Sequence, residues 1–248
     1  MRRAIALVLI ALISAGIALG AMNARAQENS GRLGDIAIFR SQFLVPDRSF
    51  GDSARQEAER RLDSLEARAQ SMSAAAFELE LARIIALADN GHTTVFSRER
   101  AGRFNRAPVR LAPFGEDFHV IRAARAQADL LGAQLVAIDG HAIADLRGAA
   151  RTLHGGTAAW RDRFAPYLLE SPALLHALGL ADRDDRARYR FRLRDGRLIT
   201  RLLLADAPDA NAVNGVRALF PAPAADEAQG WRSALAPPSA PWSLREPD

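Results

Sequence analysis

Asp89 and His92 are the residues whose types and spacing best fit acid–base chemistry in this chain. They lie in the segment Asp89-Asn90-Gly91-His92-Thr93, directly after a predicted helix. A carboxylate near a histidine can orient the ring as a general base. Such a pair at the C-terminal end of a helix can equally satisfy backbone groups and suit the helix dipole. Both interpretations stay open, and the two residues are weak catalytic candidates because no nucleophile motif accompanies them.

The residue types in the chain give little support to other kinds of site. The chain contains no cysteine and no lysine, which excludes disulfides, a lipoprotein anchor and a serine–lysine dyad. No glycine loop of the phosphate-binding type follows a strand. The remaining histidines are isolated in the sequence, so we predict no metal and no cofactor, and no substrate-binding residue is assigned. These histidines are His119, His141, His154 and His176.

Two helices are expected in the first part of the chain. Apolar residues recur at helical spacing over residues 54–70, and Ser53 is predicted to start this helix as part of a capping box. A second helix is predicted to start at Ser73 and to stop at Asn90-Gly91. Residues 27–92 are therefore expected to form a helical N-terminal segment.

A small sheet is expected within residues 93–206. Strands are predicted at 109–114, 118–123 and 135–138, the last one followed by a tight Asp139-Gly140 turn and a helix over 143–153. This order of helices and strands predicts an α+β fold.

The last predicted strands form a hairpin. Arginine and apolar positions alternate over 189–193 and 197–204, on either side of Asp195-Gly196, which favours a two-residue turn. Between the two sheet regions, Thr157 and Ser171 are predicted helix caps, and Pro166 is expected to kink or end a helix.

The first 26 residues are a predicted signal peptide. Arg2 and Arg3 precede an apolar stretch, and Ala24-Arg25-Ala26 is a small-x-small cleavage site. We expect cleavage near Ala26 and a periplasmic or secreted protein, since a chain without disulfides suits a bacterial periplasm. The alternative is that the apolar stretch remains as an N-terminal membrane anchor.

The charge balance argues against nucleic acid as a partner. The formal net charge is +4, but beyond Ala26 there are 30 basic and 29 acidic residues. Every cation is an arginine, which explains the high pI. We expect no basic stripe with interleaved aromatic residues of the kind that binds nucleic acid. No membrane contact is expected beyond the signal segment, and the oligomeric state is not assigned.

Several segments together resemble the non-catalytic N-terminal part of the C-terminal-processing (tail-specific, tricorn-related) serine peptidase family. Residues 136–143, Val-Ala-Ile-Asp-Gly-His-Ala-Ile, resemble the strand and turn of a PDZ-like module. The similarity covers roughly residues 34–248, and its other matching pieces are residues 89–93, 107–111 with Phe114, 120–124, 129–133, 171–179 and the Asp195-Gly196 hairpin.

The resemblance implies recognition of peptides or protein C-termini by strand addition to a PDZ-like region. In that family the serine nucleophile lies in a later domain, so no residue here is carried over as catalytic. We expect residues 207–248, rich in proline and alanine, to be an extended linker toward that absent domain, and the chain to be truncated and inactive alone.

Two alternatives remain at this point. A stand-alone, non-enzymatic module that binds peptides or proteins would bury Trp231 and Trp242 against its body. An independent hydrolase would place a serine within hydrogen-bond reach of His92.

Overall fold

The computed structural model describes residues 31–95, 100–208 and 230–234. It is an α+β protein, as predicted. Contacts between residues divide the chain into two compact units, with the division between Met72 and Ser73. The predicted signal peptide and Trp242 lie outside the described residues. None of the described helices combines the length and apolar composition that crossing a bilayer requires.

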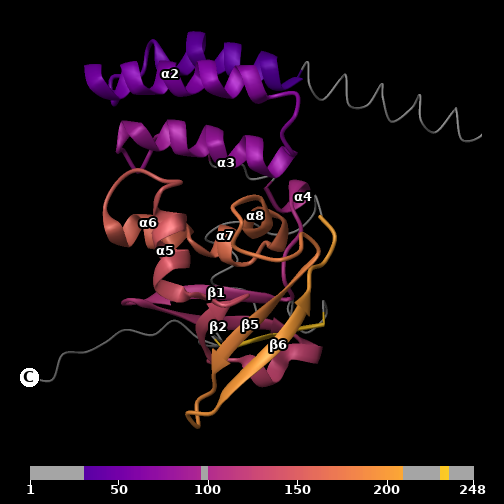
Figure 1. Ribbon diagram of the computed structural model, residues 1–248. Helices are drawn as coiled ribbons and strands as arrows, with labels where there is room; N and C mark the ends of the chain where they lie inside the picture. Colours follow the sequence, from indigo (N-terminus) through magenta and orange to yellow (C-terminus); the bar gives the residue numbers. More distant parts are fainter. Residues whose placement is uncertain (1–30, 96–99, 209–229, 235–248) are drawn as a thin grey trace, which may run out of the picture. The chain divides into compact units, whose positions relative to one another are not determined.

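The first unit is helical. Residues 31–38 form a helix that continues as the π-helix η1 (Phe39–Leu44), and α2 (Asp52–Arg68) follows (Figure 1). Its apolar side chains include the fully buried Ile36, Leu44, Leu62 and Leu65. The predicted capping box is wrong: α2 begins two residues before the predicted start, with Gly51 as N-cap and no side-chain cap.

The second unit begins with α3 (Ala74–Ile85). The Ser73 hydroxyl caps it as predicted, accepting a hydrogen bond from the Ala76 N–H at 3.1 Å. A 3-10 turn, η2 (Ala86–Ala88), continues the helix. The helical run ends at Asp89, one residue earlier than predicted, because Asp89 takes the left-handed conformation with φ of 47°.

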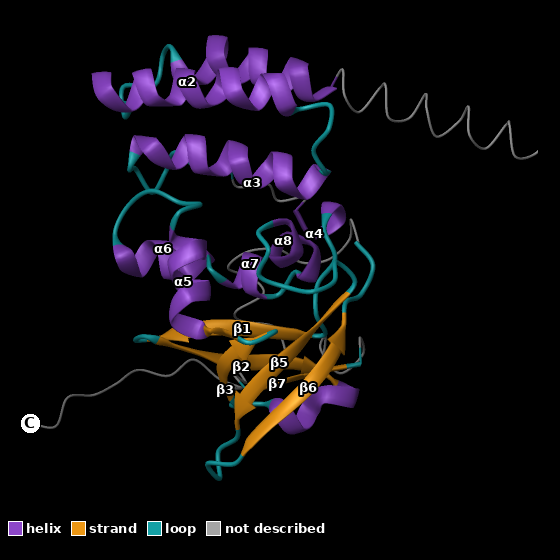
Figure 2. Cartoon of the chain, in the orientation of Figure 1, coloured by secondary structure: helices purple, strands orange, loops and turns teal. Residues whose placement is uncertain are grey.

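One antiparallel sheet forms the rest of the framework (Figure 2). Its strands follow the order β1 (Val109–Phe114), β2 (Asp117–Ala124), β3 (Gln134–Ile138), β5 (Arg186–Arg192) and β6 (Leu198–Leu204). The two-residue β4 (His141–Ala142) pairs with β3, and β7 (Trp231–Ser233) pairs with β2. The β1–β2 hairpin, β3 and the Asp139-Gly140 turn, whose residues both have positive φ, agree with the sequence analysis.

Short helices complete the second unit. These are α4 (Arg100–Arg103), η3 (Arg125–Leu130), α5 (Ile143–Arg151), α6 (Ala158–Phe164), α7 (Pro166–Leu169) and α8 (Pro172–Ala177). The helices α5 to α8 gather on one face of the sheet (Figure 2), and buried residues of both layers form one core that includes Leu135, Tyr189 and Phe191. Thr157 and Ser171 cap α6 and α8, and Pro166 separates α6 from α7, as predicted.

The β5–β6 hairpin forms as predicted, but its loop differs from the predicted two-residue turn. The Leu193 N–H donates to the Arg197 carbonyl at 2.8 Å, so three residues, 194–196, form the loop instead of two. Gly196 supplies the left-handed position with φ of 86°, and the Asp195 carboxylate accepts the Arg197 N–H at 3.0 Å. This is the three-residue loop in which a glycine follows a type I turn.

Candidate functional site

The Asp89 carboxylate joins two loops of the second unit. It accepts hydrogen bonds from the Gly156 N–H at 3.1 Å and from the Arg161 guanidinium at 2.5 Å. Both donors stabilise the charged form of the carboxylate and so lower the pKa of Asp89 from its usual value. The hydrogen bond from Gly156 has the larger effect and that from Arg161 the second largest. This carboxylate therefore fixes the position of the loop that precedes α6.

The His92 ring lies on the surface beside Trp160. The centroids of the two rings are 5.8 Å apart, and the Trp160 indole N–H donates to the Gly91 carbonyl at 2.9 Å. The His92 backbone N–H donates to the Asn90 side-chain oxygen at 3.0 Å. The loop of residues 89–93 is thus held in place by a hydrogen bond within its own turn and by contact with Trp160 of α6.

The structure brings Asp89 and His92 into one loop but does not join them. Within the described residues, no hydrogen bond links the Asp89 carboxylate to the His92 ring, and no serine hydroxyl bonds to that ring. The Asp89 contacts are those of a helix-end carboxylate that satisfies backbone groups. A catalytic role for the two residues stays a prediction.

Glycines let the two loops approach closely. A Cβ atom placed on Gly155 would lie 2.5 Å from the Asn90 backbone nitrogen. A Cβ atom on Gly91 would lie 2.7 Å from the Trp160 indole nitrogen. Real Cβ contacts are longer than both distances, so a larger residue at Gly91 would have to displace the Trp160 ring, and one at Gly155 would have to displace backbone.

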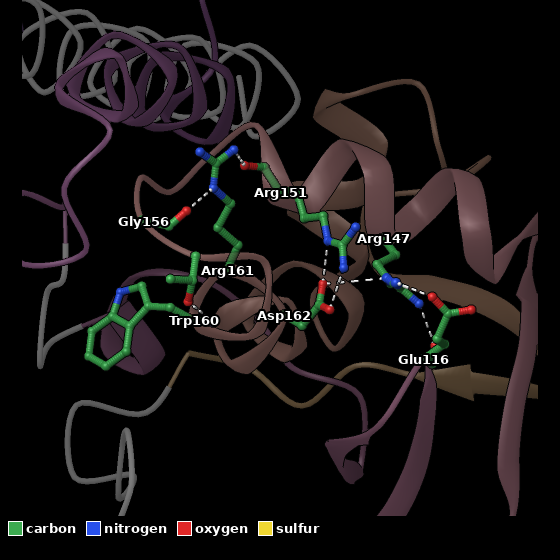
Figure 3. A network of polar contacts seen from close by, with 8 residues as sticks. Glu116, Arg147, Arg151, Gly156, Trp160, Arg161 and Asp162 are labelled. Carbon is green, nitrogen blue, oxygen red and sulfur yellow. Dashed lines mark hydrogen bonds and ion pairs between the residues drawn. The ribbon is translucent and has the colours of Figure 1, made fainter.

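A chain of polar contacts continues from this loop to the β1–β2 turn (Figure 3). The Asp162 carboxylate is buried and accepts two bonds of 2.6 Å from Arg151, while Arg147 lies 3.5 Å from it. Arg147 also donates to the Glu116 backbone and side-chain oxygens at 2.9 and 3.0 Å. Bidentate pairs of this type fix geometry as well as charge, so the network holds α5, α6 and the turn together.

The other histidines and acids do not gather around a common point. Within the described ranges, no group of three histidine, aspartate or glutamate side chains could hold a metal ion. His154 is buried, with its Nδ1 3.2 Å from the Thr94 hydroxyl and its ring 5.1 Å from that of Phe164. Its contacts are those of a core histidine.

The edges of the sheet are a second candidate site, and they differ in how far other residues cover them. The β1 edge is closed by Glu170, whose carboxylate accepts the Leu111 N–H at 2.7 Å and whose carbonyl accepts the Ala107 N–H at 2.6 Å. Pro113 has no N–H to offer there. Glu170 is 1% exposed and forms an ion pair with Arg106, which keeps the buried charge compensated.

Strand β7 pairs with the last residues of β2 and covers that part of the sheet edge. The Arg125 N–H donates to the Gly230 carbonyl and the Ala234 N–H to the Ile121 carbonyl, both at 2.8 Å. The guanidinium carbons of Arg110 and Arg122 lie 4.5 and 5.3 Å from the centroid of the half-buried Trp231 ring. Burial lowers the pKa of Arg110, and the Glu170 carboxylate opposes that change.

The β6 edge is different, because β6 pairs with β5 alone among the described strands. Leu198, Leu202 and Leu204 alternate along it on the outer face and are 43, 49 and 63% exposed. An exposed edge strand with apolar side chains is a template for pairing with another extended chain. The alternation in this hairpin is visible in the sequence, but the edge position depends on the strand order and has no local sequence signature.

The β5 strand places arginines beside these leucines. Its buried residues Ala187, Tyr189 and Phe191 face the core, while the arginines at 186, 188, 190 and 192 point the opposite way. The strand is thus a basic stripe with interleaved aromatic residues, so the prediction that the chain has none was wrong. The aromatic rings are buried in the core and cannot stack on nucleic-acid bases. In register, Arg188 lies opposite Leu202, and Arg192 lies opposite Leu198. Cross-strand partners share a face, so the outer face of the hairpin has an arginine row next to a leucine row.

Comparison with known proteins gives a weak structural likeness. No protein-family model and no curated protein matches the chain. Solved structures of CPAF, a chlamydial serine protease, are similar to it: mature CPAF complexed with lactacystin (18% identity, TM-score 0.46) and mature CPAF (16% identity, TM-score 0.45). A CPAF mutant is 17% identical with a TM-score of 0.44.

The coverage of these matches is unequal. They cover 72 to 73% of this chain, and this chain spans 35% of each of the solved chains. A likeness at this identity and TM-score assigns no function. Membership of the C-terminal-processing family and the PDZ-like character of the sheet region stay predictions.

Proposed function

We propose that this chain is a non-catalytic, peptide-binding part of a serine-peptidase type of protein, exported to the periplasm. Its ligands are extended polypeptide segments with apolar side chains at alternate positions, protein C-termini among them. Such a segment binds by adding a strand to β6, through backbone hydrogen bonds. The edge of β6, which is open among the described strands, carries the proposal together with its exposed leucines.

The side chains of β6 indicate which segments would bind. Leu198, Leu202 and Leu204 project on the same face, so an added strand would place every second side chain beside them. Apolar side chains at those positions would remove leucine surface from water, at about 25 cal/mol for each Å² buried. The backbone gives affinity for any extended chain, and the leucines give preference for apolar residues.

The contacts of Asp89 support binding over hydrolysis. Its carboxylate is engaged by Gly156 and Arg161, which are contacts that stabilise a loop. Proteolysis by this protein would then require catalytic residues other than this pair.

The proposal is tested by fluorescence anisotropy with the chain that starts at Gln27. The probe is a labelled peptide that alternates valine and threonine and has a free C-terminus. A second probe carries proline at alternate positions, which removes the N–H groups that strand addition needs. We expect the first probe to bind and the second to bind at least about tenfold more weakly, because each lost backbone bond costs on the order of 1 kcal/mol.

Variants identify the binding edge. The double variant Leu202→Ser and Leu204→Ser should weaken binding of the first probe by about tenfold through loss of apolar contact area. Phe114→Ser is the matched control, because Phe114 is similarly exposed, at 53%, but lies on β1, whose edge is closed. Equal losses in both variants would contradict binding at β6. Casein cleavage that disappears in His92→Ala would contradict the non-catalytic role.

A further inference from the structure

The outer face of the β5–β6 hairpin carries two parallel rows of side chains. One row consists of the β5 arginines at 186, 188, 190 and 192, and the other of Leu198, Thr200, Leu202 and Leu204 on β6. All except Arg186 are exposed, and Arg186 is half-buried. The face is therefore cationic along one strand and mainly apolar along the next.

Positive charge is concentrated toward the hairpin loop. Arg186 lies 3.4 Å from Asp185, and Arg188 lies 3.2 Å from Asp182, so the far end of the row is largely neutralised. By contrast, Arg190 and Arg192 have no acidic partner among the described residues. The exposed Arg194 adds a further positive charge in the loop.

The position of the arginine row restricts its ligand. A strand added to β6 would lie next to the leucines, and β5 would be a further strand spacing of about 4.8 Å away. A ligand that neutralises Arg190 and Arg192 must consequently lie over the face of the hairpin. To use both rows, this ligand needs negative charge and apolar groups side by side.

We propose that this face binds to the surface of an anionic lipid bilayer. Arg190 and Arg192 would contact lipid phosphates, for which the planar guanidinium is well suited, and Leu198 and Leu202 would enter the boundary between headgroups and acyl chains. No membrane contact was expected beyond the signal segment, so this proposal departs from that expectation. The two proposals share the β6 leucines, but they can be tested separately, because membrane binding also needs the β5 arginines and does not need the free backbone edge of β6.

The test is co-sedimentation with lipid vesicles, again with the chain that starts at Gln27, which contains both compact units. Vesicles of phosphatidylglycerol and phosphatidylcholine in equal parts are compared with vesicles of phosphatidylcholine alone. We expect binding to the anionic vesicles, weaker at high salt because the charges are exposed. The double variant Arg190→Gln and Arg192→Gln should bind those vesicles at least about tenfold more weakly.

A matched control removes the same charge elsewhere. Arg48 and Arg60 are exposed residues of the first unit, so Arg48→Gln with Arg60→Gln should leave vesicle binding within about twofold of the unmodified chain. Three outcomes would overturn the proposal: equal losses in both double variants, equal binding to neutral vesicles, or tighter binding to short duplex DNA than to anionic vesicles. Failure here would leave the anisotropy results with peptides unaffected.

Discussion

At the scale of single residues, Asp89 connects parts of the chain that are far apart in sequence. Its carboxylate binds the Gly156 N–H, 67 residues further on, and the Arg161 guanidinium, 72 residues further on. The side chain is 71% exposed, so solvent screens these interactions and limits their contribution to stability. The local sequence predicted a helix-end carboxylate but not its partners.

The pKa of Asp89 predicts how this contribution depends on pH. Because its donors lower the pKa in the folded state, the contribution is complete above the ordinary aspartate pKa, near pH 4, and is lost as pH falls through the lower folded-state value. We expect Asp89→Asn to lower the melting temperature at about pH 7 and to have little effect at about pH 2. Thermal unfolding followed by circular dichroism measures both.

The matched control is Asp184→Asn. Asp184 is exposed, and its carboxylate makes no hydrogen bond or ion pair with any described residue. Its replacement should leave the melting temperature unchanged at neutral pH. An Asp89→Asn effect that is the same at both pH values would show that charge on this carboxylate does not stabilise the loop.

At the scale of elements, the approach of two loops depends on glycine. A Cβ atom on Gly155 would lie within 3 Å of backbone atoms of Asp89 and Asn90, and backbone cannot rotate away as a flexible side chain can. We expect Gly155→Ala to lower the free energy of unfolding by about 1–3 kcal/mol, the usual cost of overpacking. Urea unfolding followed by circular dichroism measures the change.

Gly148→Ala is the corresponding control. Gly148 lies inside α5 with nothing within 4 Å of a Cβ atom placed on it. Alanine should raise the free energy of unfolding there by up to about 1 kcal/mol, through its helix propensity. If both substitutions were neutral or stabilising, the close packing at Gly155 would not contribute to stability.

Most elements were predictable because their patterns are local. Ser73, Thr157 and Ser171 cap helices as expected. Alternation located the strands of the β5–β6 hairpin, and strand-type residues on either side of a turn located those of the β1–β2 hairpin. The hairpin loop was predicted one residue too short, since Asp-Gly occurs both in two-residue turns and in three-residue loops. The capping box at Ser53 was wrong because the helix extends back to Asp52.

At the scale of the whole molecule, β7 connects two distant parts of the chain. Trp231 packs against Arg110 and Arg122, more than 100 residues earlier in the sequence. The sequence indicated that this tryptophan favours burial but could not identify its partners. Strand order, and with it the free edge of β6, depends on similarly long-range pairings, which local patterns do not encode.

Replacement of Trp231 should weaken this connection. We expect Trp231→Leu to lower the free energy of unfolding by about 1–2 kcal/mol, because both arginine–aromatic contacts are lost. Trp231→Phe retains an aromatic ring and should cost less. Chemical unfolding of both variants measures the difference, and a leucine variant as stable as the unmodified protein would contradict the role assigned to this ring.

The closure of the β1 edge by Glu170 has a consequence for association between copies of the chain. A protein whose sheet is open at both ends resembles a bifunctional monomer in polymer chemistry, which can form long chains. Among the described strands, Glu170 and Pro113 block one end, and β6 leaves the other open. If the β6 strands of two copies paired with each other, neither copy would have an open sheet edge left among its described strands. Association through this sheet would therefore stop at a dimer.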